Sequence, residues 1–344
     1  IAGRNAFISW DARNRVYQIH KIFSEFLRGI FEQNSPERKR SFYQHAAEWF
    51  RQTGDYVSAM EYYALAQDFD GLLTVLQLDQ GHSMHNEHRE TLIGYMEACP
   101  DDLRQAHPFA LLVYALCLFS YNEIERFAEV CEELSRILES GKLAPETARE
   151  ISGEFEVLLS FSEYNDIEKM LAHYRRAADL TSSPAKFMDT RGGWTFGSPS
   201  VLYMFHREPG KLENELELLR AAMPLYHRFA KGHGCGAELV MEAERDYFRC
   251  DFASAEIAAH KALHLAGGKK QEDIVLSAVF LQARLALYRG DYVLAVDKLK
   301  NLRENLERGG WYNLMHTMEL CDAWIQLNLG RKQDIPKWIL EGDF

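Results

Sequence analysis

The sequence predicts an all-α protein built from tandem pairs of antiparallel helices that stack into an elongated solenoid. The main observation is that short turns recur at a fixed spacing along the chain. Each turn is flanked by stretches in which apolar residues follow the helical period. After residue 20 there is little alternation of apolar and polar residues, so the signal for strands is weak.

The first residues differ from this pattern. Residues 5–10 and 15–19 read as two short strands around a turn at 11–14, and residues 20–31 read as a helix. Because a hairpin and one helix cannot form a core alone, we expect residues 1–34 to be the C-terminal remnant of a winged-helix domain. The predicted contacts are between Tyr17, Ile19, Phe23 and Phe26 on this segment and Phe42 and Trp49 on the first repeat.

The repeats are predicted over residues 35–344. Turns begin at Gly54, Gly210, Cys250, Gly290 and Gly330, the last four at intervals of 40 residues, and Tyr121-Asn122 and Tyr164-Asn165 fill the gap. A period of this size is typical of solenoids, in which each unit buries its apolar face against its neighbours.

Small residues recur at fixed distances from these turns. Alanine stands seven residues before a turn at positions 47, 243, 283 and 323, and five residues after one at 59, 255 and 295. Small side chains at these points let two helices approach closely, as in tetratricopeptide repeats and their right-handed superhelix. Ser35-Pro36 and Ala144-Pro145 mark helix starts, whereas 181–200 is the longest irregular segment.

Composition excludes several classes of protein. Of 344 residues, 47% are hydrophobic and 26% charged, which is ordinary for a folded chain. The net charge of -12 argues against nucleic-acid binding by this chain itself. No apolar run approaches the roughly 18 residues of a membrane span, and the six scattered cysteines read as buried thiols in a reducing compartment. We therefore expect a cytoplasmic location.

Motifs of catalysis and of cofactor binding are missing. The Gly267–Lys270 stretch lacks the first glycine and the Ser/Thr of a phosphate loop. His82, His85 and His88 lie in a polar linker that is a poor metal site. Paired carboxylates such as Glu213 and Glu215 read as solvated helix faces. We expect a binding or sensor module and not an enzyme, with no cofactor held by this chain.

Several of these stretches together resemble a known family. The run Asn5–Asp11 followed by Tyr17–Leu27 is similar to the winged-helix exit of large ATP-dependent LuxR-type (MalT-like) transcriptional regulators, and 45–64, 92–108 and 335–338 resemble the helical region that follows. Ile22 and Trp10 stand where that family usually has leucine. The resemblance implies a sensor domain, with an ATP-binding domain before it and a helix-turn-helix after it. It implies as partners a small-molecule effector or a regulatory protein, and the other domains of the same regulator.

A candidate ligand site follows from the register of the repeats. In a tetratricopeptide superhelix the first helix of each pair lines the concave face, and aromatic rings beside charged groups there suit a small polar ligand. Arg284 is the leading candidate, because an inward Arg on an apolar helix needs a partner. The predicted inward residues are Met204, Arg207, Glu244, Tyr247, Arg284, Tyr288, Thr317 and Trp324.

Two alternatives remain open at this stage. Glu244 is a possible structural partner of Arg284, and the rings then simply pack between helices. The whole chain is alternatively a peptide-binding scaffold with no small-molecule effector. A pocket closed by residues 181–200 would favour the sensor, and an open groove lined by Lys, Arg and Asn would favour the scaffold.

Overall fold

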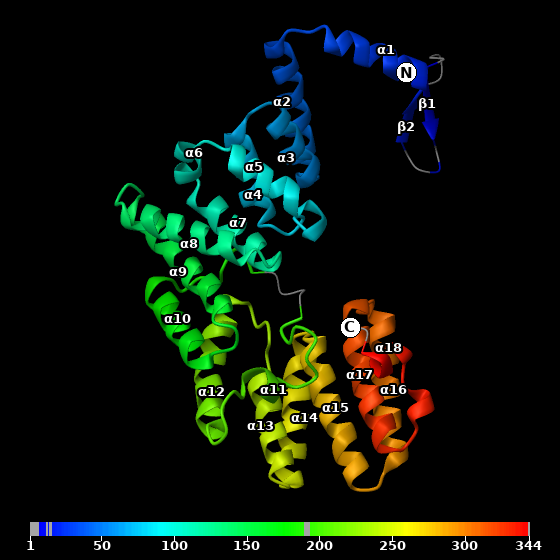
Figure 1. Cartoon of the computed structure of the whole chain (residues 1–344). Helices are drawn as coiled ribbons and strands as arrows, with labels where there is room; N and C mark the ends of the chain where they lie inside the picture. The colour runs from blue at the N-terminus through cyan, green and yellow to red at the C-terminus, as the bar shows by residue number, and fades with distance from the viewer. Residues whose placement is uncertain (1–6, 12, 14–15, 189–192, 343–344) are drawn as a thin grey trace. The chain divides into compact units, whose positions relative to one another are not determined.

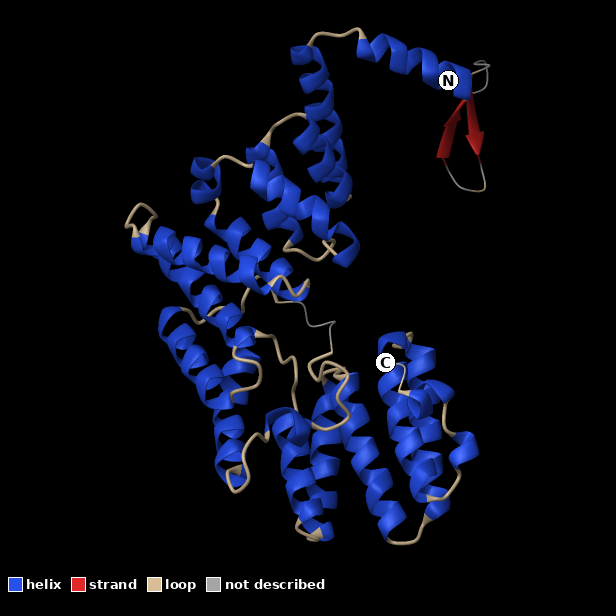
Figure 2. Cartoon of the chain, in the orientation of Figure 1, coloured by secondary structure: helices blue, strands red, loops and turns tan. Residues whose placement is uncertain are grey.

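A computed structural model describes residues 7–11, 13, 16–188 and 193–342, and apart from one hairpin its regular structure is helical (Figures 1 and 2). The all-α prediction is therefore confirmed. The chain divides into two compact units, residues 1–137 and 138–344. This division falls within one helix and was not predicted, whereas the predicted boundary followed residue 34.

The N-terminal segment has the predicted elements. Strands β1 (Ile8–Asp11) and β2 (Val16–Ile19) pair antiparallel with Ile8 opposite Ile19, and α1 (Lys21–Glu32) follows directly. Asn5 and Ala6, which were assigned to the first strand, lie outside the described residues, as do residues 12 and 14 of the predicted turn and residue 15 of the second predicted strand. The hairpin and the helix are therefore confirmed within the described part.

The predicted packing of this segment on the first repeat is wrong. Tyr17, Phe26 and Trp49 are 64%, 60% and 59% exposed, and α1 contains no buried residue. The aromatic side chains of the segment contact one another instead: the Phe7 and Phe23 rings stack with their centroids 5.1 Å apart. An aromatic contact to the next helix is made by Phe31, which was not on the predicted list.

The first unit continues with short helices around its own core. The largest buried side chains of this core come from α3, α4, α5 and α7, including Met60, Leu72, Met96 and Leu111. The helices are α2 (Pro36–Thr53), α3 (Tyr56–Leu65), α4 (Phe69–Asp79), α5 (Arg89–Ala98), α6 (Asp101–Ala106), α7 (Pro108–Ser120) and α8 (Ile124–Glu139).

The second unit holds longer helices, of which α9 packs on α10, α13 on α14, and α15 on α16 (Figure 1). Contacts also join α13 to α15 and α15 to α17, so alternate helices are neighbours. The helices are α9 (Pro145–Ser162), α10 (Ile167–Leu180), α11 (Val201–Phe205), α12 (Leu212–Phe229), α13 (Ala237–Phe248), α14 (Phe252–Gly268), α15 (Glu272–Tyr288), α16 (Tyr292–Gly309), α17 (Met315–Asn328) and α18 (Lys337–Glu341).

The recurring turns share one local chemistry. Gly54, Cys250 and Gly290 all have left-handed backbone, with φ of 81°, 63° and 78°. The aspartate that follows each of them accepts a hydrogen bond from the backbone N–H three residues later, at 3.0–3.1 Å. A left-handed residue ends one helix and the aspartate caps the next, so two residues reverse the chain. The predicted turns at these positions are confirmed.

The small residues of the pattern lie between paired helices. Ala243, Ala283, Ala255 and Ala295 are completely buried, and Ala323 is 5% exposed. A larger side chain at these positions would push the helices apart. The predicted role of the alanines in close helix packing agrees with this burial.

The succession of helices contains an irregular stretch before α11. The described residues between the end of α10 and the start of α11 form no helix, and α11 has five residues. The predicted irregular segment is therefore confirmed for 181–188 and 193–200. Within this stretch, Leu202 and Gly197 bond through their backbones to Glu244 and Thr317, two of the predicted site residues.

Candidate binding site around Arg284

Arg284 lies one turn before the end of α15 and is 6% exposed. Four aromatic rings surround its guanidinium, with distances from Cζ to the ring centroids of 4.2 Å for Tyr247, 5.3 Å for Phe248, 5.6 Å for Phe280 and 5.4 Å for Trp324. Each ring face attracts a cation through its quadrupole. We call these four residues the aromatic cage.

The guanidinium has rings around it, but its Nε lacks an acceptor. This atom is buried and has no hydrogen-bond partner within the described chain. A buried charge without a counter-charge is costly, and five N–H donors demand acceptors. Ring contacts offset part of the charge but supply no acceptor oxygen.

The cage is assembled from three alternate helices. Tyr247 and Phe248 come from the last turn of α13, Phe280 from α15, and Trp324 from α17. Phe280 precedes Arg284 by four residues, so both lie on one face of α15. The Phe280 and Trp324 rings also meet edge to face at 5.7 Å. Three residues that were predicted to face the same side, Tyr247, Arg284 and Trp324, therefore lie in contact.

The carboxylate of Glu244, one turn before Tyr247, is buried nearby. It accepts a hydrogen bond from the backbone N–H of Leu202 at 2.8 Å and is 2% exposed. Burial raises its pKa, and hydrogen bonds from Ser200 and Leu202 together with the positive charge of Arg284 offset this only in part. Glu244 is therefore close enough to interact electrostatically with Arg284. The hydrogen bonds that its carboxylate accepts, however, come from residues at the start of α11.

Residues 193–202, which we call the inner segment, are held by three helices of the second unit. Besides Glu244, Asp273 at the start of α15 accepts from the buried N–H of Thr195 at 2.8 Å, and Thr317 of α17 donates to the carbonyl of Gly197 at 2.9 Å. Trp194 is 7% exposed and lies so close to Gly234 that a Cβ there would come within 2.6 Å of its ring. The inner segment is thus fixed mainly through its backbone.

The eight predicted site residues separate into groups. Tyr247, Arg284 and Trp324 come together in the cage, with Glu244 beside them, and Thr317 bonds to the inner segment. Tyr288 is 63% exposed and contacts Phe252 with ring centroids 4.0 Å apart and the rings tilted by 35°.

The other two predicted residues have different surroundings. Met204 is 8% exposed, which is core burial, and Arg207 is exposed and donates to the carbonyl of Tyr164 at 2.9 Å.

Sequence reasoning missed Phe248, Phe280 and Asp273. Phe280 carried a usable signal, because it precedes Arg284 by one helical turn. Phe248 and Asp273 carried none, since their roles depend on which helices and loops become neighbours.

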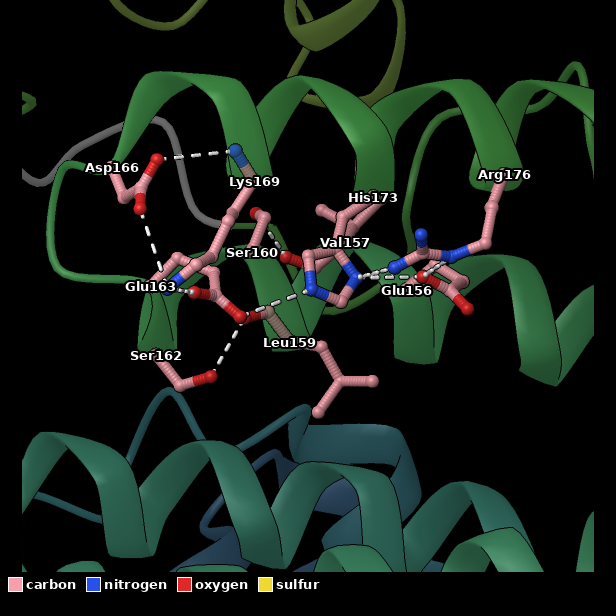
Figure 3. A network of polar contacts seen from close by, with 10 residues as sticks. All are labelled: Glu156, Val157, Leu159, Ser160, Ser162, Glu163, Asp166, Lys169, His173 and Arg176. Atoms are coloured by element: carbon pink, nitrogen blue, oxygen red, sulfur yellow. Dashed lines mark hydrogen bonds and ion pairs between the residues drawn. The ribbon is translucent and has the colours of Figure 1, made fainter.

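A second polar cluster joins α9 and α10 (Figure 3). His173, 9% exposed, contacts Glu156 through Nδ1 at 2.7 Å and Glu163 through Nε2 at 3.4 Å, and Arg176 donates to Glu156 at 2.9 Å. Burial alone would raise the pKa of Glu156, but the hydrogen bonds from His173 and Arg176 outweigh it and lower this pKa. The cluster pairs two helices and was not predicted.

Other predicted features can be placed as well. His82, His85 and His88 lie in a turn and a short 3-10 helix, and no group of three or more potential metal ligands is found among the described residues. Four cysteines are buried as predicted, whereas Cys235 is partly exposed and Cys250 is exposed at a turn. Within the described part of the chain, no helix combines the length and the apolarity needed to cross a bilayer.

Comparison with known proteins adds no assignment. No protein-family model matches the chain, and no curated protein sequence matches it.

Proposed function

We propose that this chain is the helical-repeat sensor region of a large LuxR-type transcriptional regulator of the MalT-like class, and that it binds a small effector at the aromatic cage. The supporting observation is Arg284, a buried cation that has four rings around it and whose buried Nε has no hydrogen-bond acceptor among the described residues. Such a group is costly to keep in a purely structural role.

The resemblance of the N-terminal stretch and of the repeats supplies the wider context. In that context the chain is a right-handed tetratricopeptide-like superhelix, residues 1–34 end a winged helix, and the ATP site and the DNA-reading helix-turn-helix belong to other parts of the regulator. The sensor acts in the cytoplasm, without catalysis, by passing an effector-dependent change to those parts.

A peptide-binding scaffold is the second candidate, and one observation favours it. Asp273, Glu244 and Thr317 hold the inner segment mainly through its backbone, and among the described residues Ser200 is the one side chain of the segment seen to bond to them. Side chains that hold an extended stretch of their own chain in this way can also hold a foreign peptide, because backbone groups are common to every sequence.

Thermal unfolding of the whole chain separates the two candidates. The additions are a neutral trisaccharide (maltotriose), a nucleotide (AMP), an aromatic carboxylate (phenylacetate) and a synthetic peptide with the sequence of residues 193–202. A ligand at about one hundred times its dissociation constant stabilises the folded state by about 2.7 kcal/mol, which raises the melting temperature by several degrees.

The sensor proposal requires that at least one small molecule stabilises the wild type and fails to stabilise Arg284→Gln. Arg289→Gln is the matched control. Arg289 lies just after the last residue of α15, is exposed, and forms an ion pair with Glu256. Stabilisation by the peptide alone, unaffected by Arg284→Gln, would select the scaffold and reject the sensor.

A further inference from the structure

The buried Nε of Arg284 lacks a hydrogen-bond acceptor within the described chain, and the guanidinium is held among Tyr247, Phe248, Phe280 and Trp324. The nearby carboxyl of Glu244 accepts its hydrogen bonds from the start of α11. A neutral ligand such as a sugar would supply no charged acceptor to Nε. The guanidinium fork instead matches a planar carboxylate, which accepts two parallel N–H bonds.

Two of the four cage residues are exposed to solvent, although Arg284 itself is buried. Phe280 is 6% exposed, but Phe248 is 49% and Trp324 is 36% exposed. Tyr203 of α11, 67% exposed, extends the aromatic surface because its ring lies 6.2 Å from that of Phe248. A ligand that reaches Arg284 from the side of these exposed residues passes over ring faces suited to stacking.

The charge of the ligand is restricted by Glu244. This carboxyl is buried, and the positive charge of Arg284 acts on it. A second negative group that enters the same low-dielectric region is repelled in proportion to its charge. A singly charged carboxylate is therefore favoured over a doubly charged phosphate.

We propose that the aromatic cage receives the carboxylate of a small organic acid, with Arg284 binding the carboxylate and the exposed faces of Phe248 and Trp324 stacking on the acid's apolar or aromatic part. This inference rests on the proposed sensor function and names the class of its effector. It is independent of which genes the regulator controls.

Three matched probes test the chemistry on the whole chain: phenylacetate, its neutral amide phenylacetamide, and phenyl phosphate. Binding is followed by saturation-transfer NMR and by calorimetry. Molecules of this size bind with dissociation constants on the order of millimolar even at well-formed sites, so the titrations extend into that range. We expect phenylacetate to bind at least about tenfold more tightly than the other two, since each lacks one of the required features.

Variants then assign the binding to Arg284. Arg284→Gln should weaken phenylacetate binding by at least about tenfold, and Arg284→Lys, which keeps the charge and loses the fork, should weaken it less. Arg289→Gln should bind as the wild type does. Urea unfolding of each variant checks that the fold is retained, and if Arg284→Gln does not fold, Trp324→Ala provides the comparison.

Several outcomes overturn the inference. These are equal binding of phenylacetamide, tighter binding of phenyl phosphate, no phenylacetate binding by the wild type, or unchanged binding by Arg284→Gln. If phenylacetate fails while maltotriose or AMP stabilises the wild type through Arg284, the organic-acid class alone is wrong. If no small molecule stabilises the chain, the sensor proposal fails with it.

Discussion

The hydrogen bond by which Asp273 of α15 fixes the inner segment can be tested by mutation. Its carboxylate is 5% exposed and accepts 2.8 Å and 2.9 Å hydrogen bonds from the N–H groups of Thr195 and Ile274. Asp273→Ala removes both acceptors and leaves the buried N–H of Thr195, a residue 2% exposed, without a partner. An unsatisfied buried donor costs about 1–3 kcal/mol, and loss of an acidic group from a helix start adds about 0.5–1 kcal/mol.

The sum is about 3 kcal/mol, which lowers the melting temperature of a unit of roughly 200 residues by about 6–12 °C. The matched control is Asp291→Ala, since Asp291 also caps a helix but is exposed and holds no distant segment. Loss of such a cap costs about 1 kcal/mol.

Calorimetry measures both variants, and fluorescence reports the surroundings of Trp194, which is buried on the inner segment. Asp273→Ala should also shift the emission to longer wavelength, and Asp291→Ala should not. If Asp273→Ala costs no more than Asp291→Ala and leaves the emission unchanged, the inner segment is not held as described.

Two further variants test other parts of the second unit. Glu156→Gln should destabilise the chain by about 1–2 kcal/mol at neutral pH. Because the folded state lowers the Glu156 pKa from 4.5, this difference is complete above the unfolded pKa and disappears as the pH falls through the folded pKa. Urea midpoints at pH 7 and below pH 4 check this, and an equal difference at both would contradict it. Gly234→Ala, with φ of 72° and a Cβ 2.6 Å from the Trp194 ring, should cost more than Gly290→Ala, where φ is 78° and nothing lies within 4 Å. Equal melting temperatures of the two glycine variants would argue against that close contact.

The parts of the fold that depend on local chemistry could be predicted. Gly54-Asp55 and Gly290-Asp291 identify turns because glycine tolerates left-handed backbone and aspartate caps the next helix. The buried alanines follow from the same period. The placement of Tyr17 and Phe26 could not be predicted, because their apolar character indicates a need for burial without indicating a partner, and the structure leaves both exposed.

The candidate site was predictable to a similar extent. Arg284 was identified because a charged residue inside an apolar helix is unusual, and Tyr247 and Trp324 followed from the register of the repeats. The hydrogen bond that Glu244 accepts from Leu202 was not foreseen. It joins positions more than 40 residues apart in the sequence, and one of them lies just after an irregular stretch.

The proposed sensor role is tested most directly by transcript levels in cells that carry the gene in its native place. Wild type, a deletion strain, Arg284→Gln and the control Arg289→Gln are compared, with the amount of each protein measured by immunoblot. We predict that the Arg284→Gln protein accumulates to the wild-type amount and that its transcript levels change as they do in the deletion strain. Transcript levels in Arg289→Gln should match those of the wild type. Transcript levels in Arg284→Gln that match the wild type would contradict a sensing role for the aromatic cage.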